Sequence, residues 1–378
     1  MTPRPHTAAS LPLANVTEPK QDRHPGVIRP DYRPPRPPPP NPETTPPMLR
    51  RLLLATAAVL AAALAPPVAS PARAQTAPSG DCPNRGSLDA RYCDRDGDLV
   101  ADAPAQTVDP SVLVFAYTPV EDPAVYRRVW EGFLDHLGRA TGKRVQFFSV
   151  QNNAAQVEAM RAGRLHVAGF NTGSTPLAVN CAGFAPFAMM ASRDGAFGYE
   201  MEIIVPHDSP IGRVEDIRGR QMAFTAQTSN SGYKAPSALL ERQFGLRAER
   251  DYRPAFSGRH DNSVIGVANR DYEAAAVANS VMNRMFARNV VDRARIRSIY
   301  RSETFPTTAY GVAHNLSPDL AAKIRDAFFS YDWEGSPLLA EFRTSEPPQD
   351  KFVPITYRQH WEVIRQIDEA TGVSYACR

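Results

Sequence analysis

The most informative stretch of the sequence is Phe224-Thr-Ala-Gln-Thr-Ser-Asn-Ser-Gly-Tyr-Lys-Ala-Pro236. Its apolar start predicts the end of a buried strand at 221–225, and the pattern after it predicts a helix over 231–244. Ser and Asn are preferred N-cap residues, so one of them can be explained as a cap. Four consecutive donors followed by glycine also fit a small oxyanion, because the first turn of a helix has unpaired N–H groups and a partial positive charge.

The same succession of strand, polar turn and helix recurs from about residue 110. An apolar run at 111–117 predicts a buried strand, and Asp122-Pro123 then opens a helix with apolar residues at i, i+4 spacing. This alternation predicts an α/β fold, and 378 residues are enough for two lobes. Ligands of open α/β sheets bind beyond the carboxyl ends of strands. Two more polar segments therefore attract interest, Gln151-Asn152-Asn153 and Phe170-Asn-Thr-Gly-Ser174.

The charge distribution argues against a nucleic-acid partner. The chain has a net charge of +3, but nine of its 43 basic and four of its 40 acidic side chains lie in residues 1–74. The remainder therefore carries a net charge of −2. A basic patch of the kind that binds nucleic acid is not expected in the folded part.

The first 74 residues have the composition of a leader. Residues 1–47 hold 15 of the 36 prolines and form a disordered extension, which we interpret as a mis-called start before Met48. Residues 48–74 have a positive start at Arg50-Arg51, thirteen apolar residues over 52–64 and an Ala72-Arg-Ala74 cleavage site. This pattern predicts a secretory signal peptide, since the apolar run is too short for a membrane anchor. The protein is therefore expected in the periplasm.

All four cysteines follow the cleavage site, so two disulfides are expected in an oxidising compartment. Pairing Cys82 with Cys93 would close a short loop and leave Cys181 to tie Cys377 to the first lobe; four cysteines allow three pairings. The spacing does not suit zinc. The nearby segment Asp94-Arg-Asp-Gly-Asp98 fits either a calcium loop or a solvated acidic turn, because its glycine and its missing glutamate depart from the usual calcium loop.

Residues 111–371 resemble the periplasmic binding proteins of phosphonate/phosphite/phosphate ABC transporters. The resemblance runs through four segments: Thr118-Pro-Val-Glu-Asp-Pro123, Glu158-Ala-Met-Arg-Ala-Gly-Arg164, Ser229-Asn-Ser-Gly-Tyr233 and Phe256-Ser-Gly-Arg-His-Asp261. It implies a type II periplasmic-binding-protein fold, with two α/β lobes that are each a mostly parallel sheet flanked by helices. The expected division is an N-terminal segment at 75–109, a first lobe at 110–205 and 300–378, and a second lobe at 206–299.

The resemblance also implies a ligand site. The family's Ser-Thr-Ser-Gly run matches Ser229, Asn230, Ser231 and Gly232, with Asn in place of Thr, and its histidine matches His260. The alternative interpretation of His260 is a surface side chain that caps the helix that follows it. The remaining expected ligand residues follow predicted strands: Asn153, Phe170, Asn171, Ser174 and Ser280.

Two departures narrow the expected ligand. The family often has Asp-Tyr where this chain has Asn152-Asn153, and acids that hold an aminoalkyl group fall near Ser280 and Thr308 here. The resemblance therefore implies a small or unsubstituted phosphorus oxyanion, or a phosphonate without an amine. The partner would be a membrane permease, and the protein would act as a monomer with no cofactor and no metal.

Three other functions remain open from the sequence. Ser229 or Ser231 with His260 and Asp261 could be drawn as a catalytic triad, although no nucleophile-elbow pattern surrounds either serine. The same fold could bind a sulfur oxyanion or a thiamine-precursor-like ligand. Aromatic residues that could line such a pocket are Phe170, Phe184, Phe187 and Tyr199. The protein could also present its ligand to a sensor rather than a transporter.

Overall fold

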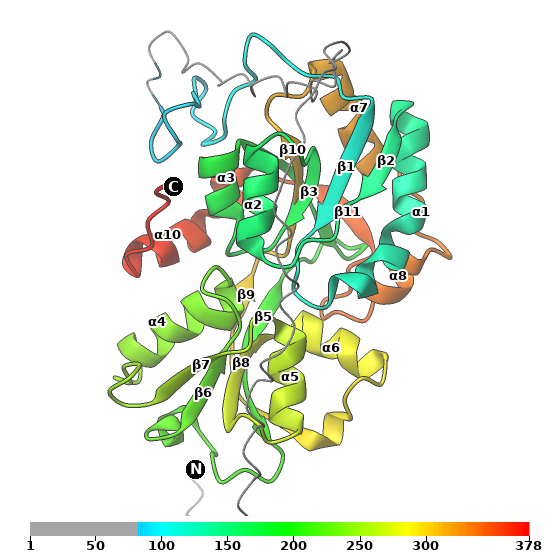
Figure 1. Cartoon of the computed structure of the whole chain (residues 1–378). Helices are drawn as coiled ribbons and strands as arrows, with labels where there is room; N and C mark the ends of the chain where they lie inside the picture. Colours follow the sequence, from blue (N-terminus) through cyan, green and yellow to red (C-terminus); the bar gives the residue numbers. More distant parts are fainter. Residues whose placement is uncertain (1–81, 83, 378) are drawn as a thin grey trace, which may run out of the picture. The chain divides into compact units, whose positions relative to one another are not determined.

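The computed structural model describes residues 82 and 84–377, which form two α/β lobes, each built on one sheet (Figure 1). The first lobe's sheet has the order β11-β4-β10-β3-β1-β2. Its strands are β1 (Val112–Tyr117), β2 (Arg144–Phe147), β3 (Val167–Phe170), β4 (Phe184–Ala191), β10 (Ala309–Ala313) and β11 (Lys351–Pro354). Its helices are α1 (Pro123–Thr141), α2 (Asn153–Arg161), α3 (Thr175–Ala182), α7 (Pro318–Phe329), α8 (Pro337–Phe342), α9 (Tyr357–His360) and α10 (Glu362–Ala370).

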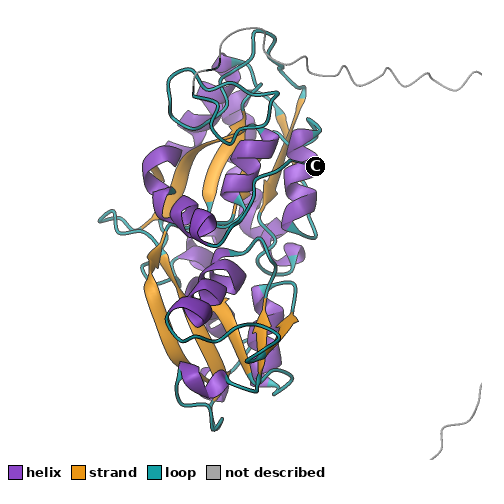
Figure 2. Ribbon diagram, turned by 90° about the vertical axis from the view of Figure 1, so that its left-hand side faces the viewer, coloured by secondary structure: helices purple, strands orange, loops and turns teal. Residues whose placement is uncertain are grey.

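The second lobe is built on a sheet with the order β7-β6-β8-β5-β9. Its strands are β5 (Tyr199–Pro206), β6 (Gln221–Phe224), β7 (Arg253–Phe256), β8 (Ala274–Ala278) and β9 (Ile296–Phe305). Its helices are α4 (Ala235–Arg242), α5 (His260–Ala268) and α6 (Asn279–Ala287), with short turns η1 (Val214–Ile217), η2 (Asn230–Lys234) and η3 (Arg293–Arg295). Helices flank both sheets (Figure 2). The predicted two-lobed α/β fold is confirmed.

Both lobes contain the same parallel unit. In the first lobe β1 lies between β2 and β3, and in the second lobe β6 lies between β7 and β8, with all four pairs parallel. A helical segment connects each strand of a unit to the next. The six strands therefore end in polar turns of the kind from which α/β proteins build ligand sites.

The sheets are mixed, not mostly parallel as expected. Strand β10 runs antiparallel to β3 and β4, and β5 runs antiparallel to β8 and β9. The physical reason is the chain path: β5 enters its sheet from the first lobe and β10 enters from the second, so each runs against the parallel unit it joins. Because β5 and β9 pair within the second sheet, the chain passes between the two sheets at 192–198 and at 306–308. The predicted borders of the lobes were at 205 and 299.

Helix α1 shows how local sequence sets an element. The Asp122 side chain accepts a hydrogen bond from the N–H of Ala124, Pro123 occupies the first turn, and Gly142 ends the helix with a φ of 68°. Its apolar face buries Trp130 and Phe133 against the first sheet and α7. Burial of one such side chain contributes about 1.5–3 kcal/mol.

Two disulfides form, Cys82–Cys93 and Cys181–Cys377, which confirms the pairing that we considered first. The first closes a loop at the start of the described chain, and the second joins the C-terminal tail to α3. The predicted extension at 1–47 and signal peptide at 48–74 lie outside the described residues. Within the described ranges, no helix is long and apolar enough to cross a membrane.

Candidate functional site

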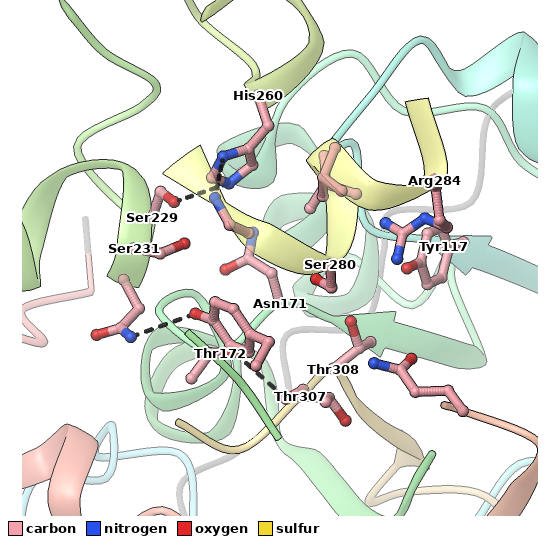
Figure 3. A pocket seen from close by; sticks show the side chains of 16 residues that line it. Tyr117, Asn171, Thr172, Ser229, Ser231, His260, Ser280, Arg284, Thr307 and Thr308 are labelled. Carbon is pink, nitrogen blue, oxygen red and sulfur yellow. Dashed lines mark hydrogen bonds between the residues drawn. The ribbon is translucent and has the colours of Figure 1, made fainter. Parts of the chain in front are cut away.

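A small cavity of about 40 Å³ lies where the turns after the strands of the two lobes meet (Figure 3). One water molecule needs about 10–15 Å³ of such volume, so the cavity holds only a few atoms of that size. Residues of both lobes line it: Tyr117, Val120, Asn171, Thr172, Tyr199, Ser229, Asn230, Ser231, His260, Ala278, Ser280, Val281, Arg284, Thr307, Thr308 and Gln349. Most of these side chains are buried, so the lobes are closed over the cavity.

The turn after β6 supplies a group of donors. The Oγ of Ser229 caps the turn by accepting a hydrogen bond from the N–H of Gly232 at 3.0 Å. Residues Asn230–Lys234 form a π-helical turn, η2, before α4 begins, so the predicted helix over 231–244 starts with a wider turn than expected. Among the described residues the Ser231 hydroxyl has no hydrogen-bond partner, and it lies beside the cavity (Figure 3).

Gly232 is required for the shape of this turn. A Cβ at this position would lie 1.9 Å from Thr225 Oγ1 and 2.8 Å from Ser229 Oγ, closer than real Cβ atoms approach. The turn can therefore pack on the end of β6 only with glycine at position 232. This is the physical reason why glycine follows the donor run.

Asn230 connects the turn to the second sheet. Its Nδ2 donates to the hydroxyl of Tyr199 at 3.2 Å, and its Oδ1 is buried without a hydrogen-bond partner. Tyr199 is therefore held with its phenol at the cavity wall. The sequence had suggested Tyr199 for an organic pocket, together with Phe184 and Phe187, but those two phenylalanines are buried in the core of the first lobe.

His260 is oriented as a neutral donor. Its Nδ1 accepts the backbone N–H of Ala278 at 3.1 Å, so in the neutral ring Nε2 carries the hydrogen. Nε2 lies 3.4 Å from Ser229 Oγ at the cavity wall. Burial lowers the pKa of His260 to about 3, and the positive charge of Arg284 adds to this effect. The ring is therefore uncharged at neutral pH.

The residues considered for a catalytic triad do not assemble into one. A triad needs a carboxylate on Nδ1 of the histidine, but the N–H of Ala278 occupies this atom. The Asp261 carboxylate instead accepts the N–H of Asp122 at 3.0 Å and pairs with Arg259. The Ser229–His260 contact is thus part of a donor wall and not of a nucleophile and base with an orienting acid.

Arg284 is a cavity residue that the sequence analysis missed. Its guanidinium is buried, and its Nε lies 3.6 Å from carboxylate oxygens of both Glu121 and Glu341. Arg288 pairs with the same two carboxylates, so two positive charges face two negative ones. Burial by itself lowers the pKa of Arg284, but interactions with Tyr126, Tyr117, Glu121 and Glu341 outweigh this effect and keep the pKa above its usual range. The cluster is neutral as a whole.

A sequence signal could have found this arginine. Arg284 lies four residues after Ser280 in the helix that follows β8, so the two share a helix face. Tyr117 is the last residue of β1, and Thr307 and Thr308 connect β9 to β10. They occupy strand ends, but their segments carried no run of donors that would have drawn attention.

Six of the nine expected ligand residues line the cavity: Ser229, Asn230, Ser231, His260, Asn171 and Ser280. The side chain of Asn171 also forms hydrogen bonds within the first lobe. Its Nδ2 donates to Thr118 Oγ1 and Asn153 Oδ1, and its Oδ1 accepts the N–H of Ser174. Five of these six residues belong to the second lobe, and Asn171 belongs to the first.

The other three expected residues lie outside the cavity walls. Asn153 donates across the lobes to Thr228 Oγ1 at 2.8 Å, so it contacts the opposite lobe. Phe170 is fully buried and packs on Phe184 with ring centroids 4.8 Å apart. Ser174 is buried, and its hydroxyl and N–H both bond within the turn at Asn171. Asn153 and Ser174 follow strands as predicted, whereas Phe170 is the last residue of β3. All three side chains contact other protein groups and not the cavity.

The acidic segment near the first disulfide brings three carboxylates together. Oxygens of Asp94, Asp96 and Asp102 lie within 4.8 Å of one another. Asp94 accepts the N–H groups of Gly97 and Leu99, and Arg95 pairs with Asp102. These bonds are those of a well-formed turn, and the calcium loop and the solvated acidic turn both stay as alternatives.

Two α/β lobes closed over a small polar cavity define a substrate-binding protein. Residues 115–361 match the family model described as ABC transporter, phosphonate, periplasmic substrate-binding protein. The chain belongs to this family and is therefore the substrate-binding component of an ABC transporter. Members of this family are periplasmic proteins that serve transport.

Curated relatives support the assignment. The chain is 24% identical over 279 residues to the phosphate-import protein PhnD of Mycolicibacterium smegmatis, covering 70% of this chain and 87% of the relative. It is 24% identical over 223 residues to the phosphonates-binding periplasmic protein of Escherichia coli, covering 58% of this chain and 66% of that protein.

Solved structures support the fold. A binding protein of an ABC phosphonate transporter from Pseudomonas aeruginosa matches with a TM-score of 0.63 and 23% identity, covering 71% of this chain and 90% of that one. PhnD1 from Prochlorococcus marinus, in complex with methylphosphonate, matches with a TM-score of 0.62 and 16% identity, covering 70% and 100%.

Proposed function

We propose that the protein captures phosphate, phosphite or a small phosphonate without an amine in the cavity between its lobes and delivers it to a membrane permease. The observation that carries this proposal is the donor wall formed by Ser229, Ser231 and His260, which presents O–H and N–H groups and no net charge. Such groups suit a tetrahedral oxyanion. The protein acts as a monomer in this proposal.

The size of the cavity supports a small ligand. About 40 Å³ holds a few water-sized atoms, which corresponds to one tetrahedral head group with at most a small substituent. The lining includes Val120, Ala278 and Val281, which could contact a methyl group but offer no polar partner. A nucleotide or a larger organic ligand would need the lobes to open.

The charge of the lining disfavours an amine. No aspartate or glutamate occurs among the lining residues of the described chain. Glu121 and Glu341, which pair with the lining residue Arg284, already face two arginines, Arg284 and Arg288. An alkylammonium group in the cavity would therefore lack a counter-ion, and its desolvation would oppose binding.

The relatives point the same way. The Mycolicibacterium relative is a phosphate-import protein, and the Prochlorococcus structure holds methylphosphonate. Both ligands are small and carry no amine. Both relatives therefore support a small phosphorus oxyanion without an amine, which the size and charge of the cavity also favour.

A thermal-unfolding panel on the protein purified from the periplasm tests the proposal. The ligands are phosphate, phosphite, hypophosphite, methylphosphonate, aminoethylphosphonate, sulfate and a thiamine-type pyrimidine. A ligand present at a hundred times its Kd adds about 2.7 kcal/mol to the free energy of unfolding. We expect one or more amine-free phosphorus oxyanions to raise the melting temperature. Stabilisation by sulfate or the pyrimidine alone would refute the proposal.

The variant Ser231→Ala tests whether the ligand-induced rise in melting temperature comes from binding in the cavity. Loss of a hydrogen bond to a charged ligand costs about 1.5–3 kcal/mol, so most of the ligand-induced shift should disappear. The matched control is Ser237→Ala, three residues into α4, where the Oγ is buried without a partner and does not line the cavity. This control should keep the full shift.

The proposal includes export through the signal peptide at 48–74. Cleavage after the Ala72-Arg-Ala74 pattern would leave residue 75 at the N-terminus. Sequencing the N-terminus of the periplasmic protein checks this. A chain that stays in the cytoplasm and starts at residue 1 would contradict it.

A further inference from the structure

The end of the chain crosses from the first lobe to the donor turn of the second. We call residues 362–377 the C-terminal strap; it comprises α10 and the tail that follows. Two contacts hold this region on the first lobe: Cys377 forms a disulfide with Cys181 of α3, and Trp361, just before the strap, donates its indole N–H to the carbonyl of Thr172 at 2.9 Å. The strap is therefore anchored beside the cavity.

A buried ion pair joins the strap to the second lobe. The Nζ of Lys234 lies 2.8 Å from Oδ1 of Asp368. Lys234 is 5% exposed and Asp368 is 1% exposed, so water reaches neither group freely. Lys234 belongs to η2, the same turn that carries Asn230 and Ser231 to the cavity wall. The pair thus acts on the turn that presents the donors.

Further bonds fix both partners. The Nζ of Lys234 also donates to the carbonyl of Gly173, in the turn after β3, at 2.9 Å. Oδ2 of Asp368 accepts the hydroxyl of Tyr375 at 2.8 Å, next to the disulfide-bonded tail. One ammonium therefore bridges the strap and the first lobe's own turn, and one carboxylate bridges the second lobe and the tail.

The two contacts of Lys234, with Asp368 and with the carbonyl of Gly173, depend on the lobes being closed. Lys234 lies in the second lobe, whereas Gly173, Asp368 and Tyr375 belong to the first lobe or its strap. Separation of the lobes would expose both charges to water. Closure instead removes them from water, and that cost is offset only when both partners are present and well oriented.

Resting on the proposed function, we propose that Lys234 and Asp368 are positioning residues for oxyanion capture: neither lines the cavity, yet together they lock the donor turn onto the first lobe and slow ligand release. The ligand and the pair stabilise the same closed state. Removal of one partner leaves a buried charge alone on closure, so the closed, ligand-holding state loses population while the open, ligand-free state keeps its stability.

The first test is Lys234→Met, with binding of phosphate and methylphosphonate measured by calorimetry and by stopped-flow tryptophan fluorescence. Truncating one partner of a buried charge pair mainly accelerates dissociation, and we expect Kd to rise about 30-fold or more through koff. The melting temperature without ligand should stay unchanged. The matched control is Lys323→Met, which breaks an exposed Lys323–Asp319 pair of the same 2.8 Å length within α7 and should leave Kd unchanged.

A second variant separates a lock from a general structural role. Lys234→Met combined with Asp368→Leu replaces the pair by apolar groups, and we expect it to recover about tenfold or more of the lost affinity, because no buried charge is left alone. Unchanged affinity in Lys234→Met overturns the inference. A ligand-free melting temperature that falls together with affinity, without recovery in the double variant, overturns it as well. If the unmodified protein binds no phosphorus oxyanion, the proposed function itself fails.

Discussion

His260 is a buried residue whose protonation links the cavity to pH. The backbone N–H of Ala278 fixes its tautomer, and burial lowers its pKa to about 3 compared with 6.5 for the free side chain. Below pH 6.5 the His260 side chain binds a proton in the unfolded chain but stays neutral in the folded chain. Stability is therefore full above this pH and falls as the pH drops towards 3.

We expect His260→Gln to flatten this pH dependence. From pH 7 to pH 5 the unmodified protein should lose about 2 kcal/mol more unfolding free energy than the variant, measured by denaturant titration at each pH. His314 is a useful comparison, because burial lowers its pKa to about 4 and it does not line the cavity. His314→Gln should flatten the slope similarly without changing oxyanion affinity. If the free energy of unfolding depended on pH equally in the unmodified protein and in both variants, the lowered pKa values of His260 and His314 would be contradicted.

At the scale of elements, strand ends were more predictable than the contacts of individual side chains. The donor turn after β6 could be found because helix capping alone needs one polar side chain and not a run of them, whereas His260 after β7 was predicted from the family resemblance. Asn153 and Ser174 also follow strands, yet they bond to Thr228 and to Asn171. The partner of Ser174 is only three residues away, whereas the partner of Asn153 lies in a distant segment that no local pattern identifies.

The sheets show the same limit. Alternation of strands and helices predicted the α/β class and the parallel units, which are local. The antiparallel entry of β5 and β10 could not be read from it, because strand direction there depends on which lobe the chain comes from. The position of Arg284 one helical turn after Ser280 is local, but its pairing with Glu121 and Glu341 could not be predicted, because these residues lie in distant segments.

The disulfide that holds the C-terminal strap should contribute more stability than the other. Cys181–Cys377 closes a separation of 196 residues, compared with 11 for Cys82–Cys93. Loop-closure entropy predicts losses of about 5 and about 3 kcal/mol for the two double Cys→Ala variants, measured by chemical denaturation. In addition, only the double substitution of Cys181 and Cys377 should weaken oxyanion retention, because it frees the tail that carries Tyr375. Equal effects of both on Kd would argue against the role of the strap.

For the molecule as a whole, closure requires a glycine at position 173. A Cβ there would lie 2.4 Å from the backbone N of Asn230 and 2.4 Å from the carbonyl oxygen of Thr228, both in the opposite lobe. Gly173→Ala should therefore keep the lobes apart. Overpacking of this kind costs about 1–3 kcal/mol, so oxyanion affinity should fall about tenfold or more.

Small-angle scattering checks this expectation. The unmodified protein should contract when phosphate or methylphosphonate is added, whereas Gly173→Ala should contract less. The matched control is Gly132→Ala in α1, where the nearest atom to a new Cβ, the hydroxyl oxygen of Tyr331, lies at an ordinary 3.5 Å. It should bind and contract normally. Full contraction of Gly173→Ala would show that the two turns can move apart without opening the lobes.

The balanced charges around the cavity bear on the surroundings in which the protein can work. The arginine among the described lining residues faces two glutamates, and the donors around it are neutral. Dissolved salt screens attraction between exposed charges but has little effect on hydrogen bonds inside a closed cavity. Calorimetry in about 50 mM and about 500 mM sodium chloride should give Kd values within about twofold of each other. The protein would then gather its ligand as well from saline as from dilute water.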